Sequence, residues 1–356
     1  MEIVRLGYVG CGLMAQKVHI PNFASTAGCG LVAVAEVRRD IREKVADRYG
    51  IPRRYASARE MAEAGDLDAV AVSADYSLQG EVAMEFLKRG LPVFMEKPMA
   101  TTVAQARRIL EAARQGGGRL MVAYMKRYDA GNHLARDAIR AARQSGELGR
   151  ARFVRAHGFC GDWTAGLDMP FEKSAEPNPP SPMAAPDWLP EKWHKPYVSY
   201  LQQYTHNINL VRWLLDAGDN VRVRAVDLDD DGMTGLAVLE VAGVRAVIES
   251  GGMNYHAWDE HTQVYFEHGW VRTSSPPLLL KNVPAEVDIY RARPTRQFLR
   301  PVPQPAWMWA YKREAEEFIR CVRTGDPFDA SGEDTLTDVR LYEEIYRTWL
   351  KGRGEV

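Results

Sequence analysis

Short apolar segments alternate with amphipathic ones along the first 125 residues. The apolar segments are rich in Val and bounded by Gly, Pro or charged residues, which is typical of strands buried on both faces. Between them, hydrophobic positions recur at the spacing of one helix face. We therefore predict strands at Ile3–Val9, Leu31–Val37, Ala69–Ala74, Pro92–Met95 and Leu120–Ala123, and helices at Leu13–Ser25, Asp40–Tyr49, Leu78–Arg89 and Thr101–Gln115. This alternation indicates a doubly wound parallel sheet with helices on both faces.

The pattern changes after residue 126. One helix (Gly131–Arg143) and one strand (Arg152–His157) precede a long proline-rich loop, residues 159–196, and loops of this length are usually functional or disordered. Further on, the pattern predicts a helix at Tyr197–Ala217, strands at Val221–Leu228, Leu236–Val241, Arg245–Ser250, Gln263–Glu267 and Trp270–Ser274, and closing helices within 307–351. Alternating segments joined by short turns predict an open, largely antiparallel sheet. The chain is thus expected to be α/β throughout, with domains at 1–125 and 126–356.

The composition of the chain excludes several classes of protein. The 356 residues are too many for one core, and 46 basic against 47 acidic residues leave no basic excess for a nucleic-acid backbone. No apolar stretch is long enough to span a bilayer, and the N-terminal segment lacks the features of a signal peptide. Four scattered cysteines without CxxC spacing favour a reducing compartment over a disulfide or zinc framework. We therefore expect a cytoplasmic protein without a metal site.

A glycine-rich turn follows the first predicted strand, with the pattern Gly10-x-Gly12-x-x-Ala15. The first glycine permits a tight turn, the second lets the backbone approach a pyrophosphate, and the third small residue allows close packing of helix on strand. Its place between a strand and a helix predicts a dinucleotide-binding Rossmann domain. The residues assigned to the cofactor at this turn are Gly10, Cys11, Gly12, Leu13 and Met14.

The end of the second predicted strand bears on the choice of dinucleotide. The carboxylate of Glu36 is placed to accept hydrogen bonds from a ribose 2′-hydroxyl and to repel a 2′-phosphate, which favours NAD. Arg38 lies two residues further on and could receive that phosphate, so NADP stays open. Both residues are assigned to the cofactor site.

The fourth predicted strand ends in Glu96-Lys97-Pro98, at the sheet edge where α/β proteins bind ligands. Together with the glycine turn, this motif closely resembles the Gfo/Idh/MocA family, named for glucose–fructose oxidoreductase and inositol dehydrogenase. Arg127-Tyr128 resembles the domain junction of that family. The resemblance implies that Lys97 reaches both the nicotinamide ribose and the substrate hydroxyl, that Glu96 and Ala74 lie at the cofactor, and that Arg127 lies at the substrate.

A second motif lies on the helix after the proline-rich loop. The family commonly carries Asp, His and Asp at positions that correspond to Gln202, His206 and Asn209, which share one helix face. Here the histidine is retained but the carboxylates are amides. A carboxylate beside an imidazole raises the pKa of the imidazole, so without one His206 is expected to be a weaker base. Lys97 is then expected to contribute more to stabilising the developing alkoxide. A structural histidine, catalysis relocated to Tyr200 or Tyr204, and lost catalysis all stay open.

The resemblance implies an NAD(P)-dependent oxidoreductase acting on a secondary alcohol of a sugar, cyclitol or glycoside, with Lys97 and His206 assisting hydride transfer. Substrate contacts are assigned to Gln202, Tyr204, Asn209, Arg127 and Trp163, because aromatic rings pack on the C–H faces of sugars. Two alternatives remain: oxidation–elimination of a glycoside by a lyase, and dinucleotide sensing without turnover. By resemblance we also expect a homodimer or homotetramer.

Overall fold

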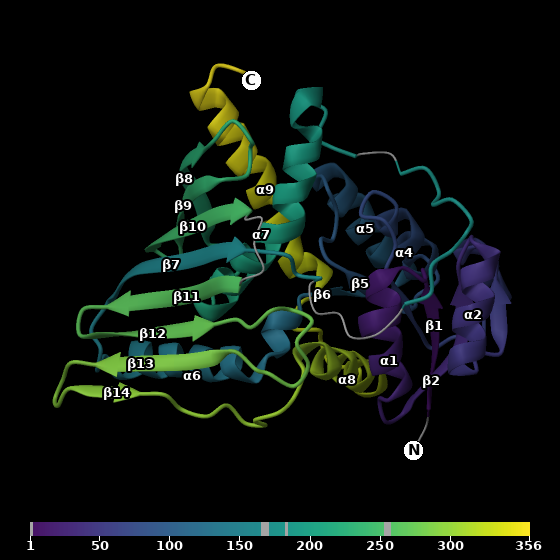
Figure 1. Ribbon diagram of the computed structural model, residues 1–356, viewed down its shortest axis with the longest axis horizontal. Coiled ribbons are helices and arrows are strands. Elements are labelled where there is room, and N and C mark those ends of the chain that lie inside the picture. Colours follow the sequence, from purple (N-terminus) through teal and green to yellow (C-terminus); the bar gives the residue numbers. More distant parts are fainter. Residues whose placement is uncertain (1–2, 165–170, 182–183, 253–257) are drawn as a thin grey trace. The chain divides into compact units, whose positions relative to one another are not determined.

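The computed structural model describes residues 3–164, 171–181, 184–252 and 258–356 (Figure 1). The chain divides into two compact units, which are described separately. Unit 1 comprises residues 1–124, 168–184 and 311–339, and unit 2 comprises 125–167, 185–310 and 340–356. Helix α9 (Gly332–Gly352) begins in unit 1 and continues in unit 2. No helix in the described part of the chain is long and apolar enough to cross a membrane.

Unit 1 is built on a six-stranded parallel sheet in the order β3-β2-β1-β4-β5-β6. The strands are β1 (Val4–Val9), β2 (Cys29–Ala35), β3 (Arg53–Tyr55), β4 (Ala69–Val72), β5 (Pro92–Glu96) and β6 (Arg119–Ala123). The strand order reverses between β1 and β4, and α/β proteins bind their ligands in the crevice at such a reversal. The predicted doubly wound parallel sheet is confirmed.

Helices cover both faces of this sheet. They are α1 (Ile20–Ala24), which continues η1 (Ala15–His19), then α2 (Arg39–Tyr49), α3 (Ala58–Ala64), α4 (Gln79–Leu87), α5 (Val103–Gly116) and α8 (Ala310–Thr324). On one face, Met61, Phe86 and Ile109 from α3, α4 and α5 join the core. On the other, Phe23 of α1 and Phe318 of α8 pack edge-on against Phe94 of β5.

Two short elements of unit 1 escaped the sequence prediction. Strand β3 is three residues long and carries two arginines, so it has no apolar signal. Helix α3 begins after the N-cap Ser57, whose Oγ accepts from Glu60 N–H (3.1 Å), and the Glu60 carboxylate accepts from Ala56 N–H (3.0 Å), one residue before the cap. The Ser-x-x-Glu spacing is the sequence signal that could have found α3.

Unit 2 contains an eight-stranded sheet in the order β14-β13-β12-β11-β7-β10-β9-β8. Its strands are β7 (Ala151–Cys160), β8 (Val221–Leu228), β9 (Gly235–Val241), β10 (Val244–Gly252), β11 (Trp258–Phe266), β12 (Gly269–Ser274), β13 (Glu286–Arg291) and β14 (Gln297–Leu299). Among the described residues of this sheet, β7 and β10 form the only parallel pair, so the predicted largely antiparallel sheet is confirmed. Strands β13 and β14 were not predicted.

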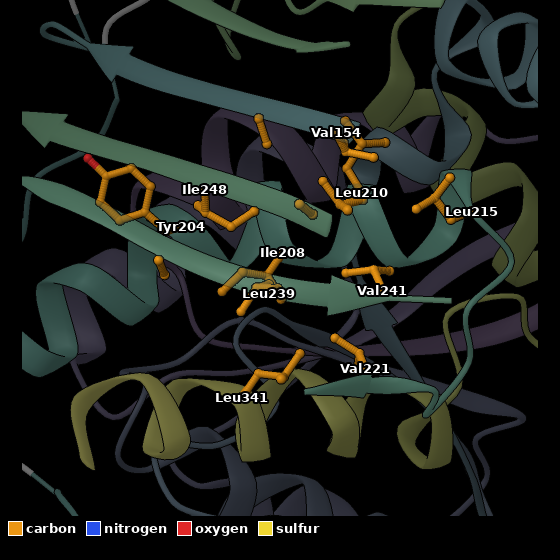
Figure 2. Packing of buried hydrophobic residues seen from close by; sticks show 14 of the residues in the cluster. Val154, Tyr204, Ile208, Leu210, Leu215, Val221, Leu239, Val241, Ile248 and Leu341 are labelled. Atoms are coloured by element: carbon orange, nitrogen blue, oxygen red, sulfur yellow. The ribbon is translucent and has the colours of Figure 1, made fainter. Parts of the chain in front are cut away.

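Helices α6 (Ala130–Ser145) and α7 (His194–Leu214) pack on one face of the sheet of unit 2 (Figure 1). The strands alternate buried and exposed positions, and the buried ones meet the apolar side of α7. Figure 2 shows Ile208 of α7 among Leu239, Val241 and Ile248 of β9 and β10. This core fixes the position of α7, and with it the polar residues that the helix carries.

Candidate dinucleotide and substrate sites

The glycine turn after β1 has the geometry that a dinucleotide requires. Gly10 adopts a φ of +93°, and a Cβ added there would lie 2.2 Å from Ser73 O, so only glycine fits. Gly12 is exposed, and a Cβ built on it would have nothing within 4 Å. The backbone at Gly12 is therefore open to a pyrophosphate. Leu13 and Met14 are half-buried beside it, and Cys11 is buried beneath.

Glu36 lies immediately after β2, with its carboxylate directed at this turn. The carboxylate accepts from Cys11 N–H (2.8 Å) and from Arg38 Nε (2.9 Å) and Nη2 (3.0 Å). Burial by itself would raise the pKa of Glu36, but the hydrogen bonds from Arg38 and Cys11 outweigh burial and lower that pKa. The two residues that favour opposite dinucleotides in the sequence therefore form one ion pair, which partly neutralises the arginine.

Residues 171–181 of the proline-rich loop belong to unit 1 and contact three of its loops. Gln16 and the backbone of Glu172 exchange two hydrogen bonds (3.0 and 2.8 Å). Asp40, at the start of α2, accepts from Ser174 Oγ and from Ala175 N–H (2.8 Å). Arg38 Nη1 donates to Asn178 Oδ1 (2.7 Å), and Ser181 Oγ donates to the carboxylate of Asp75. The contacted residues of unit 1 follow β1, β2 and β4.

This segment crosses the sheet edge at which the residues predicted to bind the cofactor lie. These hydrogen bonds were not predicted, because polar residues between prolines have no periodic signal and their partners lie more than a hundred positions away.

Lys97 follows β5 at the same edge and is held by its neighbours. Its backbone N–H donates to Glu96 Oε2 (2.8 Å), while Glu96 Oε1 bonds the ring of buried His19 (2.6 Å). Gln79 Nε2 donates to the carbonyls of Glu96 (2.9 Å) and Pro98 (2.6 Å), on either side of Lys97. The half-buried Lys97 side chain thus leaves a backbone fixed on both sides, and Ala74 lies half-buried after β4.

In unit 2, the predicted substrate residues lie on and beside α7. His206, Asn209 and Tyr204 are buried, and Gln202 is half-buried. Asn209 Oδ1 accepts from Arg127 Nε (2.8 Å), so the structure brings these two residues together. Trp163 lies three residues beyond β7 and is half-buried.

Two tyrosines of α7 were alternatives for relocated catalysis. The phenol oxygen of Tyr204 accepts from Gly251 N–H (2.7 Å), and burial raises the pKa of Tyr200 and of Tyr204 above the usual range. Burial thus favours the neutral form of both phenols. Lys97 belongs to unit 1 and His206 to unit 2.

One buried polar cluster was missed by sequence reasoning. Lys126, Asn207 and Glu260 come together beside α7 in unit 2. They occur in three unrelated local patterns, and the sequence carries no signal that joins them. In the part of the chain that the structure describes, no group of three or more His, Cys, Asp or Glu side chains is arranged to hold a metal ion.

A parallel sheet with this strand order, a glycine turn after β1 and an acidic residue after β2 define the class of Rossmann dinucleotide-binding proteins. Residues 4–124 match the sequence model of the GFO_IDH_MocA family, described as an oxidoreductase family with an NAD-binding Rossmann fold. An inositol 2-dehydrogenase of Rhizobium meliloti is 24% identical over 98% of each chain. Over residues 4–124 the chain is thus similar to this family of oxidoreductases.

Other relatives are similar over different lengths. An inositol 2-dehydrogenase/D-chiro-inositol 3-dehydrogenase of Shouchella clausii is 37% identical, over 36% of this chain and 38% of its own. The fold is shared with an aldose-aldose oxidoreductase from Caulobacter crescentus in complex with glycerol (TM-score 0.73, 22% identity, 98% of each chain). It is also shared with an oxidoreductase from Agrobacterium radiobacter in complex with NAD+, L-tartaric acid and magnesium (TM-score 0.72, 16% identity, 98% of this chain and 97% of that one).

Proposed function

We propose that this protein is an NAD(P)-dependent dehydrogenase or reductase that acts on a secondary alcohol of a sugar, cyclitol or glycoside. The observation that carries the proposal is the arrangement around Lys97. A lysine at the carboxyl end of a parallel strand, in a sheet with a dinucleotide turn, has both backbone neighbours tied down by Glu96 and Gln79. A lysine whose backbone is held at this edge is suited to stabilise charge on a reacting oxygen.

The residues of unit 1 fit the dinucleotide, since Gly10 accepts no side chain and Gly12 leaves its backbone open. When bound, the nicotinamide supplies the hydride acceptor or donor. Lys97 donates a hydrogen bond to the substrate oxygen and stabilises the negative charge that develops as the C–H bond breaks. His206 accepts the hydroxyl proton, directly or through Lys97. In the reverse direction the same groups return the proton to the oxygen.

The name of the relative from Rhizobium meliloti supports a cyclitol as the first substrate to test, and the name of the structural neighbour from Caulobacter crescentus supports aldoses. NAD is proposed as the preferred dinucleotide, because the Glu36 carboxylate faces the turn and already pairs with Arg38. NADP stays an alternative.

The test is a screen of the purified protein with NAD and NADP against a panel of cyclitols, sugars and glycosides. Lys97→Ala is expected to lower kcat by about 100-fold or more while NAD affinity, measured by calorimetry, falls far less. Lys88→Ala is the matched control, because Lys88 is an exposed lysine of the same unit at the end of α4. Undiminished activity of Lys97→Ala would remove the assigned role.

The same screen separates the two alternative activities. Release of an aglycone without net NADH would identify the lyase, and NAD binding without turnover of any alcohol would identify the sensor. The proposed homodimer or homotetramer is tested by light scattering after size exclusion.

A further inference from the structure

A buried ion pair with a spare acceptor lies beside α7. Glu260, the third residue of β11, pairs with Lys126 of the short helix η2 (Met125–Tyr128). Its Oε1 also accepts from Asn207 Nδ2 (3.1 Å), and Lys126 Nζ lies 3.3 Å from Ser275 Oγ. Lys126, Asn207 and Glu260 are 5, 3 and 7% exposed, respectively. We call these three residues the Glu260 cluster.

The second oxygen of Glu260 distinguishes this cluster from an ordinary buried ion pair. Glu260 Oε2 is buried and has no hydrogen-bond partner among the residues that the structure describes. A carboxylate oxygen withdrawn from water without a donor is costly, and such groups in native proteins call for an explanation. The missing partner must be a hydrogen-bond donor, since an ionised carboxylate only accepts.

The position of the cluster connects it with the predicted substrate residues. Asn207 directly follows His206 in α7, and Glu260 pairs across the sheet with Gly158 of β7. A Cβ added to Gly158 would lie 3.3 Å from Asn207 Nδ2, so the strand leaves little room for a side chain beside the cluster. Strand β7 ends two residues later, at Cys160.

The charges of the cluster indicate the chemistry of its ligand. Lys126 neutralises Glu260, so an added anion or cation would gain little there. A neutral donor fits better, and the ammonium and amide groups beside it can donate to a second oxygen. A polyol with two adjacent hydroxyl groups meets both requirements, because one hydroxyl donates to the carboxylate and its neighbour accepts.

We propose that the Glu260 cluster is a hydroxyl-binding subsite of the substrate site, in which Glu260 Oε2 accepts from a non-reacting hydroxyl of a polyhydroxylated substrate. The inference rests on the proposed function in that it assigns part of the same site. Glu260 binds substrate in this scheme and takes no part in proton transfer.

The test uses the full-length protein with NAD bound, and myo-inositol, D-glucose and their monodeoxy analogues as probes. Glu260→Gln is expected to weaken polyol binding in calorimetry, and to raise KM, by about 10- to 100-fold, with kcat changed far less. Deletion of the contacted hydroxyl should cost the wild type a similar factor but cost Glu260→Gln little. NAD affinity should not change.

Two further variants distinguish a loss of polyol binding from a loss of folding. The double variant Lys126→Met/Glu260→Met removes both buried charges together, which proteins usually tolerate better than the loss of one partner. Asp288→Asn is the matched control, because Asp288 is a buried carboxylate of the same unit held by Arg272 (2.7 Å) and Arg300 (2.7 Å). Its polyol affinity and KM should equal those of the wild type.

The outcomes separate this inference from the proposed function. Turnover with an unchanged KM in a folded Glu260→Gln overturns the subsite and leaves the function standing. Polyol binding that depends on Glu260, without turnover, supports the subsite and removes the function. A wild type that neither binds nor converts any of the polyols overturns both.

Discussion

Replacement of Glu314 by glutamine should change how stability depends on pH. Glu314 lies on α8 in the core of unit 1, with its side chain fully buried, and neither carboxyl oxygen has a hydrogen-bond partner among the described residues. Burial raises the pKa of this carboxyl well above its usual range, and the negative charge of Glu96 adds to the effect. We expect Glu314 to be protonated in the folded protein at neutral pH.

The magnitude follows from the proton that only the folded state retains. Above about pH 4.5 the unfolded chain releases this proton, so the free energy of unfolding falls by about 1.4 kcal/mol per pH unit until the pKa of the folded state is reached. The stabilising contribution is complete below the pKa of the unfolded chain and is lost as the pH rises. The loss continues through the pH range in which the carboxyl of the folded protein stays protonated.

Urea denaturation at several pH values between 5 and 8, followed by circular dichroism, measures this difference. Glu314→Gln keeps the shape of the protonated acid but has no proton to lose, so its stability relative to the wild type should rise with pH. Glu316→Gln, at a half-exposed position two residues further along the same helix, is the control and should leave the pH dependence of the wild type in place. A stability difference between Glu314→Gln and the wild type that does not vary with pH would refute the reasoning.

Three further predictions address the cofactor site and the thiols. Gly10→Ala places a Cβ 2.2 Å from Ser73 O and should lower both the melting temperature and NAD affinity. The Cβ of Gly12→Ala meets no atom within 4 Å, so this variant should fold normally and lose only NAD affinity. Equal melting temperatures for the two variants would contradict this expectation. Glu36→Ala frees Arg38 for a 2′-phosphate and should shift the ratio of kcat/KM values toward NADP by about tenfold, and an unchanged ratio would argue against their competition. Burial raises the pKa of the thiols of Cys29, Cys160 and Cys321 to about 12. Labelling of these thiols at pH 8 should therefore be slow until guanidinium unfolds the chain. Rapid labelling of the native protein would show that the thiols are accessible as thiolates.

Much of the fold could be predicted from local pattern. Strand β8 runs from Val221 to Leu228, as its alternation predicts, and the buried strands of unit 1 follow their apolar segments closely. Elements without such a pattern were missed. Strand β14 is exposed along its length, so its residues need not alternate, and the charged strand β3 is ordered through its pairing with β2.

The glycine turn could also be predicted from a local pattern, because a positive φ at one position requires a glycine at that position. Gly10 needs its positive φ wherever the rest of the chain lies, and so the motif could be recognised before any contact was known. The identity of the residue after each strand likewise placed Glu36 and Lys97 at the ligand edge of the sheet.

Partners far apart in the chain could not be predicted. In the sequence, Glu36 and Arg38 favour opposite dinucleotides, and only their hydrogen bonds show that they form one ion pair. The contacts of residues 171–181 with the rest of unit 1 depend on how a proline-rich loop returns to the sheet. Lys126 and Glu260 are separated by 134 positions. Periodicity reports which side of an element is buried, but the group that a buried side chain meets depends on packing between elements, and that arises only when the whole chain folds.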